Sequence, residues 1–267
     1  MSAEASGART VRVAVEGEVA RVALARPEAR NAFDDRLIGE LTDTFARLSD
    51  DPAVRVILLS GDGPSFCAGA DVGWMRRAGG YSPEQNEADA ARMADMLRAI
   101  DTCSRPVVAA VHGHAMGGGV GLVAAADIAI AAEGTVFSLT EVKLGILPSV
   151  ISPYVLRAIG PRAARDLFLT GDRFDAREAH GIGLVHGVVP LEELELACGR
   201  KVDSLLSSGP EAVRAAKRLI AQVTGRSPED ARDLTVRTIA ERRASAEAKE
   251  GLSAFLEKRR AAWVRKP

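Results

Sequence analysis

Two kinds of hydrophobic pattern alternate along the chain up to about residue 190. Short apolar runs rich in valine and isoleucine, typical of buried strands, lie at residues 11–15, 19–25, 54–59, 107–111 and 128–132. The first two runs flank Glu16, Gly17 and Glu18, which predicts a β-hairpin. Because stretches with helical spacing separate the later runs, the pattern predicts an α/β fold.

Helix start signals stand before several of the amphipathic stretches. Asp34 is a candidate N-cap for a helix whose apolar residues share one face. Ser82 and Pro83 open a second helix, because proline suits the first helical turn. Further helices are predicted from Pro153 onward, in a short segment stopped by Gly171, and over residues 175–183. Residues 184–190 predict a last β-like segment.

The composition changes near residue 191, where strands and glycine loops give way to charged amphipathic stretches. Four stretches, at residues 191–208, 210–223, 227–245 and 247–263, predict helices. We therefore expect a disordered N-terminus at 1–10, an α/β core at 11–200 and a C-terminal helical region at 201–267. A helical tail of this kind often packs on another subunit or folds back over its own site.

Charge and cysteine content argue against several classes of function. The 35 Lys and Arg residues nearly balance the 36 Asp and Glu residues, whereas proteins that bind nucleic acid through phosphates are usually more basic. The three cysteines lie far apart and form no zinc-binding pattern, so we expect no metal site. Neither a signal-peptide pattern nor a bilayer-spanning run is found, and we expect a cytoplasmic protein without a membrane partner.

Two glycine-containing loops each follow a predicted core strand, at residues 66–71 (FCAGAD) and 115–121 (AMGGGVG). If both strands belong to one sheet, both loops can meet at the same edge. Gly117, Gly118 and Gly119 precede a predicted helix at 120–126, where unshielded N–H groups favour an anion or an oxygen that becomes one during a reaction. Taken alone, a run of glycines is more often a tight turn or a packing contact.

The same segment also fits the dinucleotide-binding pattern GxGxxA, through Gly119, Gly121 and Ala124. This pattern is common by chance. A dinucleotide site needs an acidic residue at the end of the next strand, whereas Asp127 precedes that strand and Glu141 follows only after further segments. We therefore set dinucleotide binding aside.

Five motifs, in their order and spacing, resemble the crotonase family, the enoyl-CoA hydratase/isomerase superfamily. They are FCAGADV, HGHAMGGGVGLVAAADIAIA, FSLTEVKLGILP, LTGDRFDAREAHGIGLV and EGLSAFLEKR, and the resemblance covers nearly the whole chain after residue 10. It implies a spiral core of repeated ββα units, a C-terminal helical region, and assembly into homotrimers or hexamers. It also implies an acyl-CoA thioester substrate, with coenzyme A as part of that substrate and no separate cofactor.

The resemblance further implies roles for individual residues. The backbone N–H groups of Ala70 and Gly118 would form an oxyanion hole, since an enolate next to a thioester needs preorganised donors. Glu141 would be the catalytic acid and base, and partial burial would raise its pKa toward neutral. The residues that would line the CoA moiety are Ala68, Ala70, Asp71, Val72, Gly73, Gly118 and, from the C-terminal helix, Lys258 with Phe255.

The chain departs from the family pattern in two places. Well-known hydratases of the family carry a second glutamate three residues after the oxyanion glycine, where this chain has Gly121. The usual glycine-rich turn after the proline of the Glu141 loop is replaced by residues 149–153, SVISP. Glu141 would thus act alone, and a single carboxylate suits an isomerase, which removes and returns one proton.

The activity therefore has three candidate descriptions. GGGVGL together with TEVKLGILPSVISPYV resembles bacterial methylglutaconyl-CoA hydratases, and on this resemblance we favour an enoyl-CoA hydratase. The alternatives are a Δ3-Δ2 enoyl-CoA isomerase and a non-catalytic acyl-CoA-binding protein.

Five residues near the glycine loops have open roles. Trp74 would roof the acyl pocket or pack in the core, and Arg76 and Arg77 would meet CoA phosphates or face solvent. His112 and His114 flank the glycine turn, and we expect them to pack or to bond to the backbone.

Overall fold

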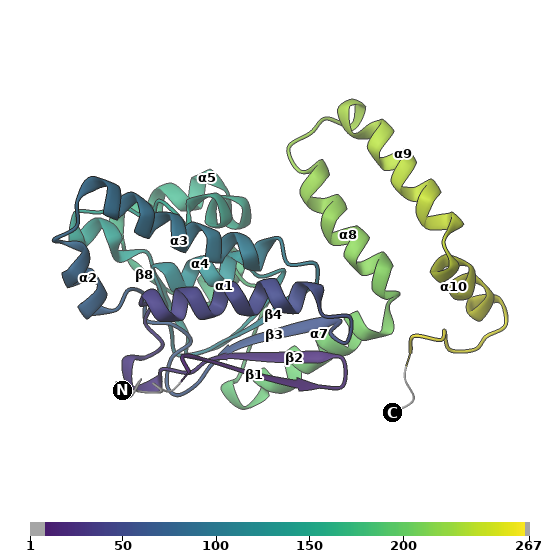
Figure 1. Ribbon diagram of the computed structural model, residues 1–267, viewed down its shortest axis with the longest axis horizontal. Coiled ribbons are helices and arrows are strands. Elements are labelled where there is room, and N and C mark those ends of the chain that lie inside the picture. The colour runs from purple at the N-terminus through teal and green to yellow at the C-terminus, as the bar shows by residue number, and fades with distance from the viewer. Residues whose placement is uncertain (1–8, 265–267) are drawn as a thin grey trace, which may run out of the picture.

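A six-stranded sheet forms the centre of the molecule, whose computed structural model describes residues 9–264 (Figure 1). Strands β1 (Val11–Glu16) and β2 (Val19–Leu24) form the predicted hairpin, in which Glu16 pairs with Val19. The strands that follow β2 in parallel, in spatial order, are β3 (Val56–Gly61), β4 (Val107–Val111), β6 (Ile128–Ala132) and β9 (Gly187–Val189).

Successive side chains of each strand enter two different cores, because they point to opposite faces of the sheet. In β3, Ile57 and Leu59 belong to a large core, whereas Val56 and Leu58 belong to a smaller one. The smaller core lies under α7 (Leu194–Ser207). The large core takes side chains from α1 (Asp35–Asp50), α3 (Pro83–Asp101), α4 (Gly118–Ala125) and α5 (Ser152–Thr170), and also Trp74, Ala176 and Ala179 from shorter helices.

A second sheet was not predicted from the hydrophobic pattern. Its strands, in spatial order, are β5 (His114–Met116), β7 (Val136–Ser138) and β8 (Arg173–Asp175). Each strand is only three residues long, which is too short to show an alternating pattern. The remaining short elements of the core are η1 (Pro27–Ala29), α2 (Val72–Ala78), η2 (Thr140–Leu144), α6 (Ala176–Gly181) and η3 (Leu191–Glu193).

Helix starts agree with the sequence signals. The Asp34 carboxylate accepts a hydrogen bond from the Leu37 N–H at 2.8 Å and caps α1, and Ser82 forms a capping box with Gln85 at the start of α3. Gly160 has non-helical backbone angles inside α5, so this element consists of two helical segments, as predicted. Helix α4 begins at Gly118, two residues earlier than predicted, which places the Gly118 N–H in the first turn.

Three helices extend away from the sheet as a C-terminal arm, α8 (Pro210–Val223), α9 (Pro228–Ala244) and α10 (Ala246–Leu256) (Figure 1). The predicted boundary at residue 200 falls inside α7, whose apolar face packs on the sheet, and the chain leaves the core between Ser207 and Pro210. An ion pair between Lys217 Nζ and Asp127 Oδ2, at 2.6 Å, ties α8 to the core.

The described chain begins at Arg9, so the predicted disordered N-terminus lies almost wholly outside it. The N–H and hydroxyl of Thr10 donate to Glu40 Oε2 at 2.8 and 2.9 Å. Among the helices of residues 9–264, none has the length and apolar character needed to cross a bilayer.

Candidate active site

Ala70 lies in the loop after β3, and the backbone of Phe33 holds the residues on both sides of it. The Phe33 N–H donates to the Gly69 carbonyl at 2.7 Å, and the Asp71 N–H donates to the Phe33 carbonyl at 2.8 Å. In such extended pairing, alternate residues direct their N–H groups to opposite sides. The Ala70 N–H therefore points away from Phe33, and within the described residues it donates no hydrogen bond.

Gly118 is the first residue of α4, and its N–H is likewise unpaired in the described chain. Gly117 precedes it with φ 50° and ψ −115°, a conformation that favours glycine, and donates its own N–H to the Ser138 carbonyl at 2.8 Å. The sequence thus supplies a helix N-terminus whose first donor is free. The positive end of the α4 dipole favours an oxygen that carries negative charge at this place.

The two loops are joined to each other by backbone hydrogen bonds. Cys67 donates its N–H to the His114 carbonyl at 2.9 Å, and its own carbonyl accepts from the Met116 N–H at 3.0 Å. A Cβ on Gly119 would lie only 2.6 Å from the Cys67 carbonyl oxygen, so the close approach requires glycine here. This contact confirms that the loops after β3 and β4 meet, which is the arrangement the sequence predicts.

Glu141 lies on η2 with its carboxylate beside the start of α4. A Cβ on Gly117 would be 2.8 Å from Glu141 Oε1, and the buried Oε2 has no hydrogen-bond partner among the described residues. Burial raises the pKa of this half-buried carboxyl group above its usual value. A carboxylate with a raised pKa and a partnerless Oε2, next to an unpaired donor, is suited to accepting and returning a proton.

The space around Gly121 is filled by Ile151. A Cβ on Gly121 would overlap Ile151 Cγ2 and lie 3.0 Å from Ile151 Cβ. Ile151 is 2% exposed and precedes α5. Gly121 and the segment at 149–153, where the sequence is expected to depart from the family pattern, are therefore in direct contact, and the contact is apolar.

Known proteins resemble this chain along most of its length. A family model described as enoyl-CoA hydratase/isomerase matches residues 14–266. The chain belongs to the enoyl-CoA hydratase/isomerase family. It is 35% identical over 253 residues to crotonyl-CoA hydratase of Syntrophomonas wolfei. The aligned region covers 94% of this chain and 96% of that relative.

Solved structures of family members have the same fold. A crystal structure of an enoyl-CoA hydratase from Shewanella pealeana superimposes with a TM-score of 0.92 at 39% identity, covering 95% of this chain and 96% of that chain. The structure of Pseudomonas aeruginosa AtuE superimposes with a TM-score of 0.93 at 36% identity. The match covers 96% of this chain and 100% of AtuE. These likenesses confirm the crotonase-like α/β fold with its C-terminal helices, and they confirm the prediction of an enzyme of this family.

Five of the residues predicted to line the CoA moiety lie along the loop after β3 and the start of α2: Ala68, Ala70, Asp71, Val72 and Gly73. Ala68 donates its N–H to the Arg30 carbonyl at 3.0 Å, and the Val72 side chain is 66% exposed. Asp71 caps α2, with Oδ1 accepting from the Gly73 and Trp74 N–H groups at 2.8 and 3.1 Å. Its side chain therefore organises the loop, and the unpaired N–H of Ala70 precedes it directly.

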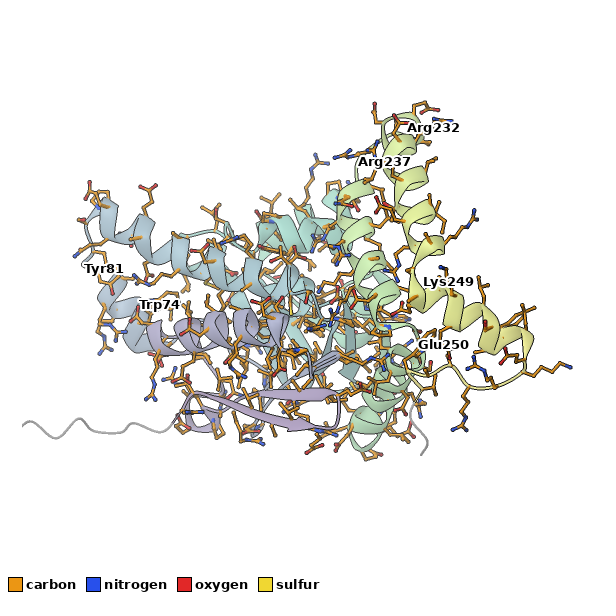
Figure 2. All side chains as sticks on the ribbon, turned by 45° about the vertical axis from the view of Figure 1, so that its right-hand side comes forward. Trp74, Tyr81, Arg232, Arg237, Lys249 and Glu250 are labelled. Atoms are coloured by element: carbon orange, nitrogen blue, oxygen red, sulfur yellow. The ribbon has the colours of Figure 1, made fainter. Side chains whose placement is uncertain are left out.

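Lys258 lies far from this loop within the chain. It follows α10, whereas the loop leads into α2 at the opposite end of the molecule (Figure 1). Trp74 on α2 and Glu250 on α10 stand on opposite sides in Figure 2 as well. Phe255, near Lys258, is 80% exposed. The structure thus brings Ala70, Gly118 and Glu141 together and leaves Lys258 apart from them.

Hydrogen bonds and ion pairs hold the residues whose roles the sequence left open. Trp74 is 8% exposed and its Nε1 donates to Asp89 at 3.3 Å, so it packs in the core. Arg77 pairs with Asp35 at 2.9 Å. His112 Nε2 bonds to the Gly63 carbonyl at 2.8 Å and His114 Nδ1 to Ser65 Oγ at 3.2 Å, which agrees with a bonding role.

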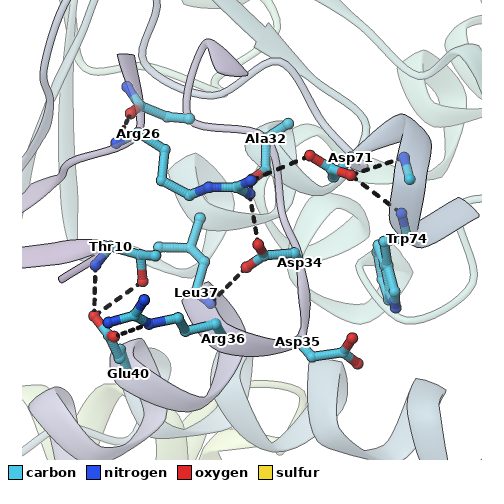
Figure 3. Close-up of polar contacts among 12 residues, drawn as sticks. Thr10, Arg26, Ala32, Asp34, Asp35, Arg36, Leu37, Glu40, Asp71 and Trp74 are labelled. Atoms are coloured by element: carbon cyan, nitrogen blue, oxygen red, sulfur yellow. Dashed lines mark hydrogen bonds and ion pairs between the residues drawn. The ribbon is translucent and has the colours of Figure 1, made fainter. Parts of the chain in front are cut away.

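Sequence reasoning missed three residues that shape this site. Met93 on α3 and Phe33 cover Gly118, since a Cβ there would lie 2.5 Å from Met93 Cε and 2.8 Å from Phe33 Cε2. Arg26 bonds to the segments that flank Ala70 (Figure 3). No periodic pattern marks Phe33 or Arg26 as site residues. Met93 was recognisable only as an apolar residue on a helix face.

Among residues 9–264, no cluster of His, Cys, Asp and Glu could hold a metal ion.

Proposed function

We propose that the protein is an enoyl-CoA hydratase that adds water to an α,β-unsaturated acyl-CoA thioester. One observation carries the proposal: the Glu141 carboxylate, with Oε2 partnerless, lies against Gly117 and so beside the unpaired Gly118 N–H. This combination supplies a proton acceptor next to a donor for an oxyanion. The relative named crotonyl-CoA hydratase supports the reaction type.

The thioester oxygen would accept hydrogen bonds from the N–H groups of Ala70 and Gly118. When water adds to the β-carbon, electrons move through the α-carbon to this oxygen, which gains the charge of an enolate. Preorganised donors stabilise that charge, and loss of one such donor typically costs about 3–4 kcal/mol of transition-state stabilisation. Both donors are backbone groups held by the Phe33 pairing and by α4, so they need no reorganisation during reaction.

Glu141 would move both protons in this reaction. As a carboxylate it accepts a proton from the attacking water, and as the acid it then donates a proton to the α-carbon. The sum of the two steps adds one water across the double bond and regenerates the carboxylate. A raised pKa suits both steps, because the group must exist in each protonation state near the working pH.

A Δ3-Δ2 enoyl-CoA isomerase is the second candidate, favoured by the contact of Ile151 with Gly121. An apolar wall in place of a second carboxylate leaves one proton carrier, which is all that a double-bond shift requires. Glu141 would remove a proton from the α-carbon of a 3-enoyl thioester and return it to the γ-carbon. The same oxyanion hole would hold the dienolate.

The CoA moiety would lie along the loop that contains Ala68, Asp71, Val72 and Gly73. Helix α10, which carries Phe255 and precedes Lys258, lies at the opposite end of the chain from this loop, so these two residues would contact CoA from a second copy in a homotrimer or hexamer. The exposed apolar side chains of Leu252, Phe255 and Leu256, grouped on α10, support such an interface. Coenzyme A belongs to the substrate, and no further cofactor is proposed.

Product analysis over a panel of enoyl-CoAs tests the proposal. The panel contains straight-chain 2-enoyl-CoAs, 3-enoyl-CoAs and methylglutaconyl-CoA, the substrate suggested by the sequence resemblance. A hydratase converts a 2-enoyl-CoA into a product heavier by one water, whereas an isomerase leaves the mass unchanged and moves the double bond. A protein that binds acyl-CoA in calorimetry but converts no member of the panel would refute both activities.

A further inference from the structure

The direction of the Ala70 N–H depends on two short segments that must stay in register. Phe33 pairs with Gly69 on one side of Ala70 and with Asp71 on the other. These two backbone hydrogen bonds form an isolated bridge and not part of a longer strand. Something else must therefore keep the segment around Phe33 and the loop around Ala70 at a fixed distance.

Arg26 bonds to both segments at once (Figure 3). Its Nη1 donates to the Ala32 carbonyl at 2.6 Å and lies 3.0 Å from Asp34 Oδ2, so it holds the residues on either side of Phe33. Its Nη2 donates to Asp71 Oδ2 at 3.2 Å, next to Ala70. A planar guanidinium can hold all three acceptors, whereas a lysine ammonium lacks this fixed geometry.

The backbone of Arg26 is itself fixed. Its N–H donates to Asn31 Oδ1, and its carbonyl accepts from the Asn31 N–H, both at 2.9 Å. Asn31 is fully buried, and its amide nitrogen donates to the Asp62 and Ser65 carbonyls at 2.9 and 2.8 Å. The Arg26 side chain thus extends from a backbone segment just after β2 that is held rigidly by Asn31.

Arg26, Asp34 and Asp71 form a cluster that is largely shielded from water, and its two aspartates each cap a helix. The side chains of Arg26, Asp34 and Asp71 are 17%, 22% and 23% exposed. Asp34 caps α1 and Asp71 caps α2, each using its other carboxylate oxygen. Burial alone would raise the pKa of Asp71, but the N–H groups of α2 and the Arg26 charge together lower it. Asp71 therefore stays ionised and bound to Arg26 near neutral pH.

We propose that Arg26 is a positioning residue of the oxyanion hole, which fixes the Ala70 N–H by linking Ala32, Asp34 and Asp71. The proposal rests on the proposed function of Ala70 as an oxyanion donor. Arg26 touches no reacting atom in this account. Its loss would displace one donor, and displacements of about 1 Å can reduce turnover by about 100-fold.

The test compares Arg26→Met with the wild type in kinetics and in carbonyl spectroscopy. The probe is hexanoyl-CoA, a saturated thioester that cannot be hydrated, and the readout is the shift of its carbonyl stretch on binding. We expect Arg26→Met to lose much of this shift and to reduce kcat by about 10–100-fold, with the hexanoyl-CoA Kd changed less than about threefold. Arg98→Met, which removes an exposed arginine paired with Asp95, is the control and should match the wild type.

Two milder variants keep the test decisive if Arg26→Met folds poorly. Arg26→Lys keeps the positive charge but loses the planar guanidinium. Asp34→Asn keeps an oxygen that can cap α1 but weakens the ion pair with Arg26. Both should lose part of the carbonyl shift and part of kcat in folded protein. A wild-type shift and wild-type kcat in both variants, or a loss confined to melting temperature, would overturn the role of Arg26. A wild-type protein without turnover would instead refute the proposed function, because the carbonyl shift can be measured without turnover.

Discussion

The Ile151 side chain occupies the space that any side chain at Gly121 would need. The two residues lie on different elements, Gly121 on α4 and Ile151 in the segment before α5. In place of the second glutamate considered in the sequence analysis, this position holds a packed apolar contact between Gly121 and Ile151. Any side chain at position 121 would therefore overlap Ile151, and the proposed site keeps Glu141 as its one proton carrier.

A double-mutant cycle tests this contact. Gly121→Ala should lower the free energy of unfolding by about 1–3 kcal/mol, because the added methyl group overpacks the core. Ile151→Ala alone should cost about 2–5 kcal/mol through a cavity. In the Ile151→Ala background, Gly121→Ala should become neutral or stabilising, and urea denaturation measures the resulting coupling.

Gly39→Ala is the matched control for this cycle. Gly39 lies inside α1 with nothing near its absent Cβ, so the alanine should stabilise the protein by about 0.5–1 kcal/mol. Equal effects of Gly121→Ala with and without Ile151 would show that the two side chains do not compete for space.

Replacing Glu141, the proposed acid and base, should stabilise the fold at neutral pH. Burial raises the pKa of Glu141 in the folded chain, so the folded state binds more protons than the unfolded state, and stability falls as pH rises. Glu141→Gln removes this penalty and should raise the Tm at pH 8. The gain should vanish below the usual carboxyl value of 4.5, where both states are protonated. Glu87→Gln, at an exposed position of α3, should show no such dependence.

The pH dependence of turnover should report the same group. Since Glu141 must be ionised to accept the proton of water, kcat should fall as pH decreases through the raised pKa of this carboxyl group in the complex. The inflection should lie above 4.5. A profile that stays flat down to this value would contradict the assignment of Glu141 as the base.

Lys258 should act on the site of another copy. Lys258→Ala should raise KM about tenfold or more, as expected for loss of a hydrogen bond from a charged group. Oligomers formed from Lys258→Ala and Glu141→Gln chains should regain about a quarter of the wild-type activity at low substrate, because some sites then combine both intact residues. Size-exclusion chromatography with light scattering should show a trimer or hexamer. A monomer, or a mixture no more active than its parts, would exclude action in trans.

The sequence predicted those parts of the fold that rest on local pattern. The valine-rich runs became the strands of the main sheet, and Asp34 and Ser82 capped their helices. Strands β5, β7 and β8 were missed because three residues show no period. Helix α2 was missed because its segment begins inside a glycine-containing loop.

The candidate site was predictable only in part. The loops with Ala70 and Gly118, and the Glu141 motif, were identified from motifs that are continuous in sequence. The contacts of Arg26 with Asp71 and of Gly121 with Ile151 join residues far apart in the chain, and no local pattern encodes such pairs. The distance of Lys258 from the site likewise depends on how the C-terminal arm leaves the core.

The reaction run in oxygen-labelled water, with wild type and Glu141→Gln side by side, tests the central claim most directly. The substrate is a 2-enoyl-CoA, and mass spectrometry follows the product. We predict that the wild type forms a labelled hydroxyacyl-CoA, and that Glu141→Gln forms it about 100–10,000-fold more slowly, as expected for loss of a general acid and base. A wild-type product without label, or undiminished label incorporation by Glu141→Gln, would contradict hydration by Glu141.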